Sequence, residues 1–310
     1  MKYVQYINSL LQDSLSKKSN TVVYGQNIDA GSCISGLTRN LSLKNHTHVI
    51  NTQNSENTLV GVGFGMMINE VSSIFFMKQT DFLLLGIDHL VNTYNIIRQT
   101  KPTASFTIFP VTVDSGYEGP QSSLNNLGDF CSIAGVDGYT FTNKNDAKDI
   151  ITNHLIKPGF RVMSTGQKYL REEILDLEIL NKSHSDDYFQ YKKGSKATIV
   201  CFNLALIYGI KLHEDMLKRK ITSSLFSVNA HLCSDYSSII NDIKETQKLI
   251  IIDDTKSRNR LSDKFLTDVL SECRLNKKIV VSRSFNEQSF YPNNDELEID
   301  NNKLIESVTN

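Results

Sequence analysis

The sequence has no tryptophan, only five prolines and almost no net charge, with 33 basic and 34 acidic residues in 310. A balance so close to neutral, without a basic cluster interleaved with aromatic residues, argues against a nucleic-acid-binding face. No apolar run is long enough to cross a bilayer, and residues 1–19 lack the apolar core of a signal peptide. We therefore expect a soluble, cytoplasmic protein that binds neither nucleic acid nor a membrane.

Several catalytic and metal-binding signatures are also missing. The five cysteines are scattered without metal-type spacing, and their odd number is typical of reduced thiols. The sequence has no G-x-S-x-G nucleophile elbow, no P-loop and no zinc signature. We expect this chain to supply no metal site of its own.

What the sequence does contain is a regular alternation of short apolar segments and amphipathic ones. Short apolar strands alternating with helices imply parallel sheets covered on both faces. The composition shifts near Gln167, after which residues 168–196 are charged and weakly patterned. We therefore predict an α/β protein of two three-layer α/β/α domains with mainly parallel sheets. They cover residues 1–167 and 197–310, with an interdomain connection at 168–196.

The periodicity also places the elements. The predicted helices cover residues 2–18, a segment starting near 56, 82–97, 145–155, 206–218, 235–246 and 261–273. The predicted strands cover 21–24, a segment ending at 49–50, 72–76, 106–113, 138–141, 160–163, 198–202, 223–228, 248–252 and 278–281.

Residues 51–66 form the most informative stretch, in which a polar loop leads to Glu56 and then to the run V-G-V-G-F-G. Asn54 or Ser55 can cap a helix that has Glu56 in its first turn. The glycines make this helix thin, so another backbone or a flat ligand can approach closely. A carboxylate at a helix N-terminus is stabilised by the unpaired N–H groups there. From this pattern alone, a first-turn acid with no further role is the more common case.

The order S-E-x-x-x-V-G-x-G-x-G, about thirty residues after V-V-Y-G-Q-N, resembles the β subunit of thiamine diphosphate-dependent 2-oxo acid dehydrogenases. More broadly, it is similar to the pyrimidine-binding half of transketolases. The resemblance implies a transketolase pyrimidine-binding domain followed by a transketolase C-terminal domain. In that family the glutamate at the position of Glu56 makes a charge-assisted hydrogen bond to a ring nitrogen of the aminopyrimidine and thereby activates the cofactor.

Two further residues are candidates for contacts with the cofactor. Phe82 lies in Q-T-D-F-L-L-L-G-I-D-H-L-V-N, which resembles a family segment whose second phenylalanine stacks on the aminopyrimidine. The alternative is a core phenylalanine on an apolar helix. The neighbouring Asp81 is expected to be a helix-end surface residue. Gln26 stands where relatives usually have a glutamate, and its amide keeps the hydrogen-bonding shape without the charge.

The loop at 116–123 departs from the family. Relatives have a histidine in G-P-x-H, where it serves proton transfer and substrate contacts, whereas this chain reads G-P-Q-S-S with Ser122 at that place. A hydroxyl donates a hydrogen bond but cannot shuttle a proton near neutral pH as imidazole does. Either the substrate differs, or another residue or a partner chain supplies the acid/base group, or activity is lost. Glu118 and Tyr117 are the nearby candidates for a replacement.

The superfamily holds the cofactor's diphosphate and Mg²⁺ with a G-D-G motif followed by N-N, and here residues 136–138 read only V-D-G. The resemblance therefore implies a separate α subunit that carries this motif and binds Mg²⁺. Thiamine diphosphate would be shared between the two chains, and a second copy of this chain would complete an α2β2 assembly. The implied reaction is decarboxylation of a 2-oxo acid with transfer of the acyl or aldehyde unit. The alternatives are the C-terminal subunit of a split transketolase or carboligating synthase acting on a ketose or sugar, and a catalytically inactive assembly or regulatory paralogue.

Overall fold

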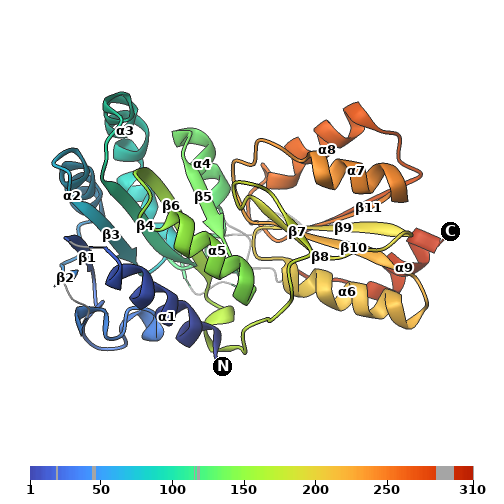
Figure 1. Cartoon of the computed structure of the whole chain (residues 1–310), viewed down its shortest axis with the longest axis horizontal. Coiled ribbons are helices and arrows are strands. Elements are labelled where there is room, and N and C mark those ends of the chain that lie inside the picture. Colours follow the sequence, from blue (N-terminus) through green and yellow to red (C-terminus); the bar gives the residue numbers. More distant parts are fainter. Residues whose placement is uncertain (19, 44–46, 115, 117–118, 284–296, 310) are drawn as a thin grey trace.

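The first half of the chain folds around six parallel strands in the order β2-β1-β3-β4-β6-β5 (Figure 1). The computed structural model describes residues 1–18, 20–43, 47–114, 116, 119–283 and 297–309. All of the strands predicted for this half are confirmed, with ends that shift by a few residues. Their bounds are β1 Thr21–Gly25, β2 Thr47–Asn51, β3 Ser72–Met77, β4 Ser105–Thr112, β5 Asp137–Thr140 and β6 Gly159–Gly166.

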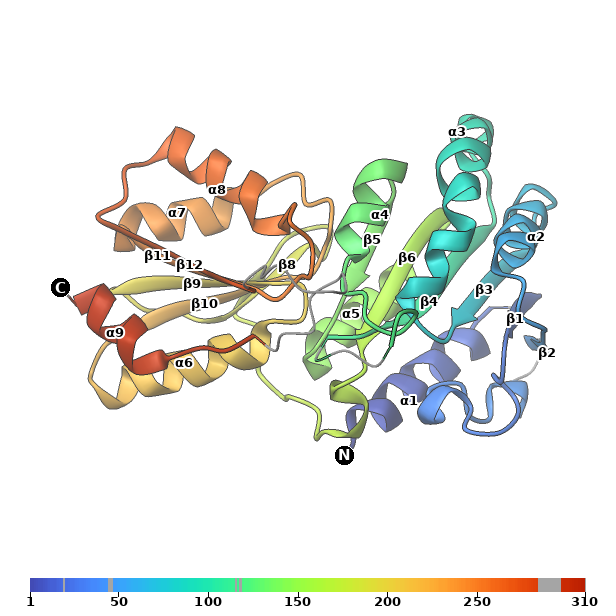
Figure 2. The same cartoon turned by 180° about the vertical axis from the view of Figure 1, so that it is seen from behind.

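Helices cover both faces of this sheet, as Figures 1 and 2 show from opposite sides. Because successive strand residues point to opposite faces, Val23 packs into one hydrophobic cluster and Tyr24 into the other. The predicted opening helix, the Glu56 helix and the helix at 145–155 are confirmed, whereas α4 was not predicted. One face carries α1 (Tyr3–Ser16) and α5 (Lys144–His154), and the other carries α2 (Glu56–Ile68), α3 (Tyr94–Ile97) and α4 (Leu127–Ala134).

The prediction of one continuous α-helix over residues 82–97 is wrong. The chain passes through a 3-10 stretch, η3 (Thr80–Gly86), a π-helical turn, η4 (His89–Thr93), the short α3 and a last 3-10 turn, η5 (Arg98–Thr100). At Gly86 the backbone lies so close to α2 that a Cβ would stand 2.6 Å from Val60 Cγ2. Leu84 and Leu85 stay more than half exposed, so the apolar run does not form one buried helical face.

The second half contains another six-stranded sheet, in the order β12-β11-β9-β10-β8-β7. Its first four strands are parallel, β8 pairs antiparallel with β10, and β7 pairs antiparallel with β8. The α/β class with two mainly parallel sheets is thereby confirmed. The strands are β7 Asn181–Lys182, β8 Tyr188–Lys192, β9 Ala197–Phe202, β10 Ser223–Val228, β11 Lys248–Asp253 and β12 Lys277–Ser282. The helices are α6 (Leu206–Lys218) and α9 (Asn301–Thr309) on one face, and α7 (Ser237–Thr246) and α8 (Leu261–Glu272) on the other.

Strands β7 and β8 come from the segment 168–196 that we predicted to be an interdomain connection. This part of the segment instead extends the second sheet, because β8 pairs with β10. The apolar face of β8 is hidden in the sequence by the lysines and aspartates around it. Where the domain boundaries lie along the chain remains a prediction. Among the described residues, no helix is both long and apolar enough to span a membrane.

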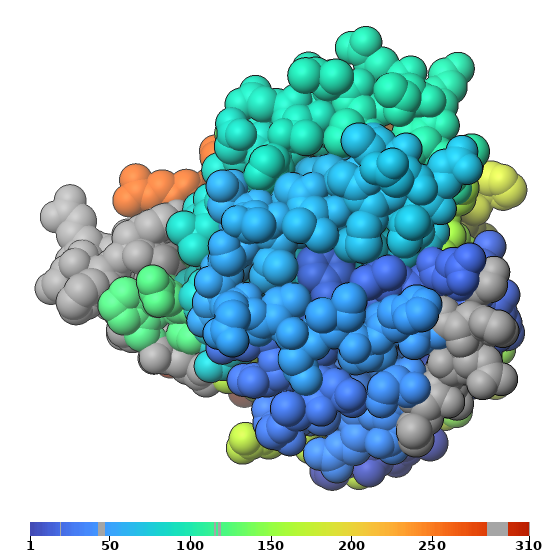
Figure 3. Space-filling model, turned by 90° about the vertical axis from the view of Figure 1, so that its left-hand side faces the viewer, coloured from blue at the N-terminus to red at the C-terminus, as the bar shows by residue number. Residues whose placement is uncertain are grey.

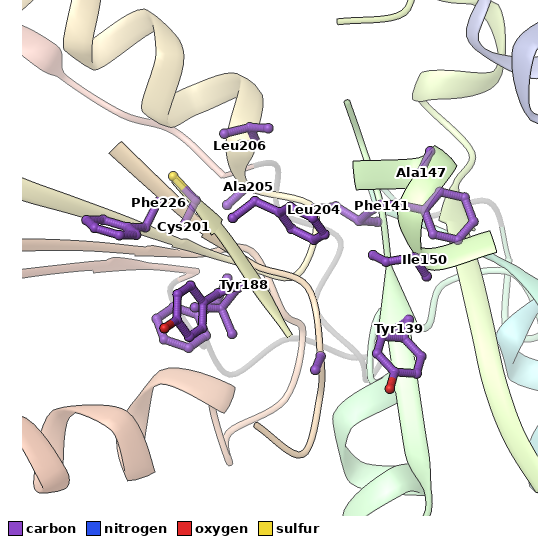
Figure 4. Packing of buried hydrophobic residues seen from close by; sticks show 14 of the residues in the cluster. Tyr139, Phe141, Ala147, Ile150, Tyr188, Cys201, Leu204, Ala205, Leu206 and Phe226 are labelled. Atoms are coloured by element: carbon purple, nitrogen blue, oxygen red, sulfur yellow. The ribbon is translucent and has the colours of Figure 1, made fainter. Parts of the chain in front are cut away.

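A single hydrophobic cluster continues from the first half into the second (Figure 4). Phe141 and Ile150 approach it from the first half and Leu204 from the second, all of them buried. Beside this contact the backbone N–H of Thr140 donates to the carbonyl of Asn229 at 2.9 Å. The two halves are therefore joined by a packed and hydrogen-bonded interface, which fixes the position of one sheet relative to the other.

Candidate functional site at the carboxyl edge of the first sheet

Glu56, Phe82 and Gln26 come together where strands of the first sheet end. Gln26 directly follows β1, Phe82 lies on η3 shortly after β3, and Glu56 opens α2 after β2. All three side chains line one small cavity of about 10 Å³, with Lys78 at its border. Three residues from separate predicted motifs thus meet at one place, at the edge where parallel sheets bind ligands.

Glu56 occupies the first turn of α2, with Ser55 as the N-cap residue. The Ser55 hydroxyl lies 2.9 Å from Thr58 Oγ1 and makes no side-chain cap bond to the helix backbone. The Glu56 side chain is half-buried, and none of the described residues forms an ion pair or a hydrogen bond with its carboxylate. The carboxylate is therefore available to a ligand, next to the partial positive charge of a helix N-terminus.

The glycines of α2 have separate structural roles. A Cβ at Gly63 would lie 2.2 Å from the Phe106 ring and 2.5 Å from the Tyr24 hydroxyl, so α2 needs glycine there to approach the sheet. A Cβ at Gly65 would meet no atom within 4 Å. Figure 3 shows this end of the molecule, where residues near 50–70 lie across the middle of the face. The helix is thus close to the sheet on one side and open to another backbone on the other.

Phe82 is half-buried at the rim of the core rather than inside it. Besides the small cavity, Phe82 also lines a groove of about 530 Å³ that the exposed Leu84 and Leu85 border, and which we call the apolar groove. Its aliphatic, aromatic and proline lining residues are Phe82, Leu84, Leu85, Ile87, Pro120, Leu124, Phe130 and Ile133.

Asp81, which we expected at the surface, is buried with 6% of its area exposed, so that expectation is wrong. Its carboxylate accepts hydrogen bonds from the backbone N–H of Ser123 at 3.0 Å and of Leu124 at 3.1 Å. The buried N–H groups of a loop need acceptors, and Asp81 supplies them. It therefore ties the turn bearing Phe82 to the loop bearing Ser122.

Ser122 is half-buried and lines a cleft of about 560 Å³, and Gln26 lines the same cleft. Gln26 therefore connects this cleft to the small cavity beside Glu56. The replacement candidates Tyr117 and Glu118 lie outside the described residues. The serine that stands in for the family's histidine thus faces the larger space next to the predicted cofactor site.

The cleft also contains three basic side chains that sequence reasoning missed. Lys78 directly follows β3, Lys168 lies two residues after the end of β6, and Arg171 ends the 3-10 turn Tyr169–Arg171 that comes next. One acid, Glu172, lines the cleft with them. Only Lys78 lies close to the end of a predicted strand, whereas Lys168 and Arg171 lie five and eight residues beyond the predicted strand at 160–163, so little in the sequence pointed to them.

No group of three or more histidine, cysteine, aspartate or glutamate side chains that could hold a metal ion occurs among the described residues. Asp137 of the V-D-G fragment begins β5, at the opposite edge of the parallel sheet from Glu56. The carboxylate, aromatic face and amide around the small cavity fit an aminopyrimidine. At about 10 Å³ the cavity encloses no more than roughly one water, so this chain alone does not surround such a ring.

Comparisons with known proteins bear on the fold and on overall sequence similarity. No protein-family model matches the chain. Over 298 residues it is 20% identical to the 2-oxoisovalerate dehydrogenase subunit beta 2, mitochondrial, of Arabidopsis thaliana, covering 91% of this chain and 80% of that protein. Its fold is similar to that of a split gene transketolase, described as an inactive beta4 tetramer. The TM-score is 0.73 with 12% identity, over 98% of this chain and 96% of that one. The chain is thus similar in sequence to a 2-oxo acid dehydrogenase β subunit and shares the fold of a transketolase.

Proposed function

We propose that this chain is the β-type subunit of a thiamine diphosphate-dependent enzyme that decarboxylates a 2-oxo acid and transfers the acyl or aldehyde unit. The observation that carries the proposal is the meeting of Glu56, Phe82 and Gln26 at one cavity. Each was singled out from a separate stretch of sequence. When bound, the cofactor supplies the electron sink for carbanion chemistry, and the protein supplies binding, orientation and charge.

The three residues divide the recognition of the aminopyrimidine. The Glu56 carboxylate holds a proton at a ring nitrogen through a charge-assisted hydrogen bond, which is stronger than one between neutral groups. Phe82 offers an aromatic face to the ring, an interaction of about 0.5–1.5 kcal/mol beyond its area burial. Gln26 donates or accepts a hydrogen bond through its amide.

The larger cleft is the substrate side of this site in our proposal. Its volume of about 560 Å³ suits a small molecule. Lys78, Lys168 and Arg171 outnumber the single Glu172, so the cleft favours an anion such as the carboxylate of a 2-oxo acid. Ser122 donates a hydrogen bond there, and proton transfer falls to another group, with Tyr117 and Glu118 still candidates.

The diphosphate end of the cofactor belongs to a partner in this proposal. An α subunit with the G-D-G…N-N motif would bind Mg²⁺ and the diphosphate, and two copies of each chain would form α2β2. The small cavity is too shallow to enclose a ring, and the apolar groove beside Phe82 leaves apolar side chains exposed. Both features fit a surface that a second chain completes. The five free thiols fit a cytoplasmic location.

Two other functions have specific support. A split transketolase or carboligating synthase subunit, acting on a ketose or sugar, is favoured by the fold neighbour and by Ser122 at the histidine position. A catalytically inactive assembly or regulatory paralogue is favoured by the same serine. In both cases the cofactor contacts proposed for Glu56 and Phe82 stay the same, and only the chemistry in the cleft differs.

Co-expression with a G-D-G…N-N subunit encoded by a neighbouring gene separates these functions. The complex is screened with thiamine diphosphate and Mg²⁺ against 2-oxo acids and against ketose phosphates with aldehyde acceptors. Cofactor-dependent release of CO₂ from a 2-oxo acid supports the proposal. Ketose cleavage without decarboxylation supports the transketolase function, and an assembled complex that binds cofactor without any turnover supports the inactive paralogue.

A further inference from the structure

The loop that carries Ser122 is held from two sides by buried charged groups. We define the substrate-side loop as residues 119–124. From the first half, Asp81 accepts the backbone N–H of Ser123 at 3.0 Å. From the second half, the Nζ of Lys256 donates to the carbonyl of Ser123 at 2.9 Å and to that of Gly116 at 2.6 Å. The N–H of Ser123 is therefore bound by an acidic side chain and its carbonyl by a basic one.

Lys256 is an unusual residue to find in this place. It follows β11 in the second half, and its side chain is fully buried. Its backbone N–H also donates to the carbonyl of Asn125 at 3.0 Å, just beyond the substrate-side loop. Burying an ammonium group costs several kcal/mol, and an apolar side chain often stabilises such a site as well or better. Stability alone therefore gives little reason for a lysine here.

The charged groups facing Lys256 come from four elements. The pKa of Lys256 is lowered to about 8, mainly by burial and secondly by the positive charge of Arg283 just after β12. Asp114 after β4, Asp81 on η3 and Asp254 after β11 act in the opposite direction. The ammonium is therefore charged near neutral pH, and its bonds to the two carbonyls are charge-assisted and strong.

We propose that Lys256 is a positioning residue, through which the second half of the chain sets the place of Ser122 in the cleft. All the described residues that line the cleft precede Asn181, where the second sheet begins, so Lys256 acts on the cleft through the loop backbone. Ser122 is joined to Ser123 by one peptide bond, and fixing both backbone groups of Ser123 restricts where the Ser122 hydroxyl can lie. We call the hydrogen bonds of Lys256 to the carbonyls of Gly116 and Ser123 the clamp. The clamp is a property of this chain, and only its effect on turnover rests on the proposed function.

Hydrogen exchange of the full-length chain tests the clamp without cofactor or partner. Lys256→Met keeps the length of the side chain and removes its donors. It should speed exchange of the Ser123 and Leu124 amides by at least about tenfold, with β9 and β10 unchanged. The matched control is Lys248→Met, because Lys248 Nζ also donates to a backbone carbonyl, that of Val308 at 2.6 Å. The control should leave the loop amides as in the wild type.

Unchanged loop protection in Lys256→Met would overturn the clamp, as would faster exchange spread evenly over the whole second half. If Lys256→Met does not fold, Lys256→Gln takes its place, since its shorter amide cannot reach both carbonyls. The same local loosening is expected, and full protection would overturn the proposal.

In an active complex with the α subunit, Lys256→Met should lower kcat/KM for the substrate by at least about tenfold. Its thiamine diphosphate affinity should stay that of the wild type, and Lys256→Arg, which keeps charged donors, should recover part of the loss. Unchanged kcat and KM despite a loosened loop would refute the positioning role. A loosened loop together with a wild-type complex that turns over no substrate would refute the proposed function and leave the clamp standing.

Discussion

The backbone N–H of Leu124 lies 3.1 Å from one carboxylate oxygen of Asp81 and 3.3 Å from the other. Asp81 is the residue before Phe82, and Leu124 follows Ser122 by two positions. One buried joint thus holds together the turn proposed to face the cofactor and the loop proposed to face the substrate. Because the joint is shielded from water, its hydrogen bonds are strong and costly to leave half-made.

Asp81→Asn should destabilise the protein, because the amide loses the charge and replaces one of the two acceptor oxygens by an NH₂ group that faces a backbone N–H. We expect a loss of about 1–3 kcal/mol in the free energy of unfolding, measured in urea. Asp88→Asn is the control, since Asp88 is exposed and, among the described residues, its side chain accepts a hydrogen bond only from the Asn92 side chain. Equal losses of unfolding free energy in the two variants would show that the hydrogen bonds accepted by Asp81 do not stabilise the fold beyond an ordinary surface contact.

Gly63→Ala and Gly65→Ala should change the free energy of unfolding in opposite directions although the two glycines lie only two positions apart on α2. The first places a methyl group 2.2 Å from the Phe106 ring, and such overpacking costs about 1–3 kcal/mol. The second meets open space and removes a helix-destabilising glycine, for a gain of up to about 1 kcal/mol. Urea denaturation of both variants checks this, and a tolerated Gly63→Ala would contradict the packing of α2 on the sheet.

His231 should make the protein sensitive to acid. It is buried, and neither ring nitrogen has a hydrogen-bond partner among the described residues. Burial lowers the pKa of His231 to about 3. The unfolded chain therefore takes up a proton as the pH falls below about 6.5 while the folded chain does not, so stability is lost over that range.

Between pH 7.5 and 5.0 the wild type should lose on the order of 2 kcal/mol more than His231→Leu. Chemical denaturation at the two pH values measures the difference. Parallel losses in both proteins would mean that the histidine is protonated in the folded state.

Ser122→His should impair the natural reaction, because an imidazole fills space in the cleft that we assign to the substrate. We expect kcat/KM to fall, and the wild-type pH profile to lack a limb that the substitution introduces. Ser122→Ala serves as the control for loss of the hydroxyl without added volume. A large gain in decarboxylation of pyruvate by Ser122→His would show an ordinary dehydrogenase subunit with a damaged site.

The sequence was sufficient for most of the fold because many of its strands, such as β4, β9, β10 and β11, are buried on both faces. All eight residues of β4 are buried. Such an apolar run can be recognised as a strand without knowing which strands it pairs with. The irregular segment from Thr80 to Thr100 could not be foreseen, because its winding follows the close contact of Gly86 with Val60. Strand β7 was missed because it is only two polar residues long, and β8 was missed because charged residues surround its three aromatic side chains.

For the candidate site, residues within recognisable motifs could be predicted, whereas those that act through distant backbone groups could not. Glu56, Phe82 and Gln26 follow predicted strands or open a predicted helix, and the structure brings them to one cavity. Asp81 and Lys256 bond to the backbone of Ser123 from 42 and 133 residues away. No local pattern marks such a contact, since any loop N–H or carbonyl can be the partner.

The most direct test of the central claim is the turnover of the assembled complex with Glu56→Gln. The substitution keeps the size of the side chain and removes the charge that holds the cofactor's ring proton. We expect unchanged assembly and thermal stability, and a turnover number lower by at least about a hundredfold. Glu70→Gln, at an exposed residue two positions beyond the end of the same helix, should match the wild type. Full turnover of Glu56→Gln in the assembled complex would contradict the assignment.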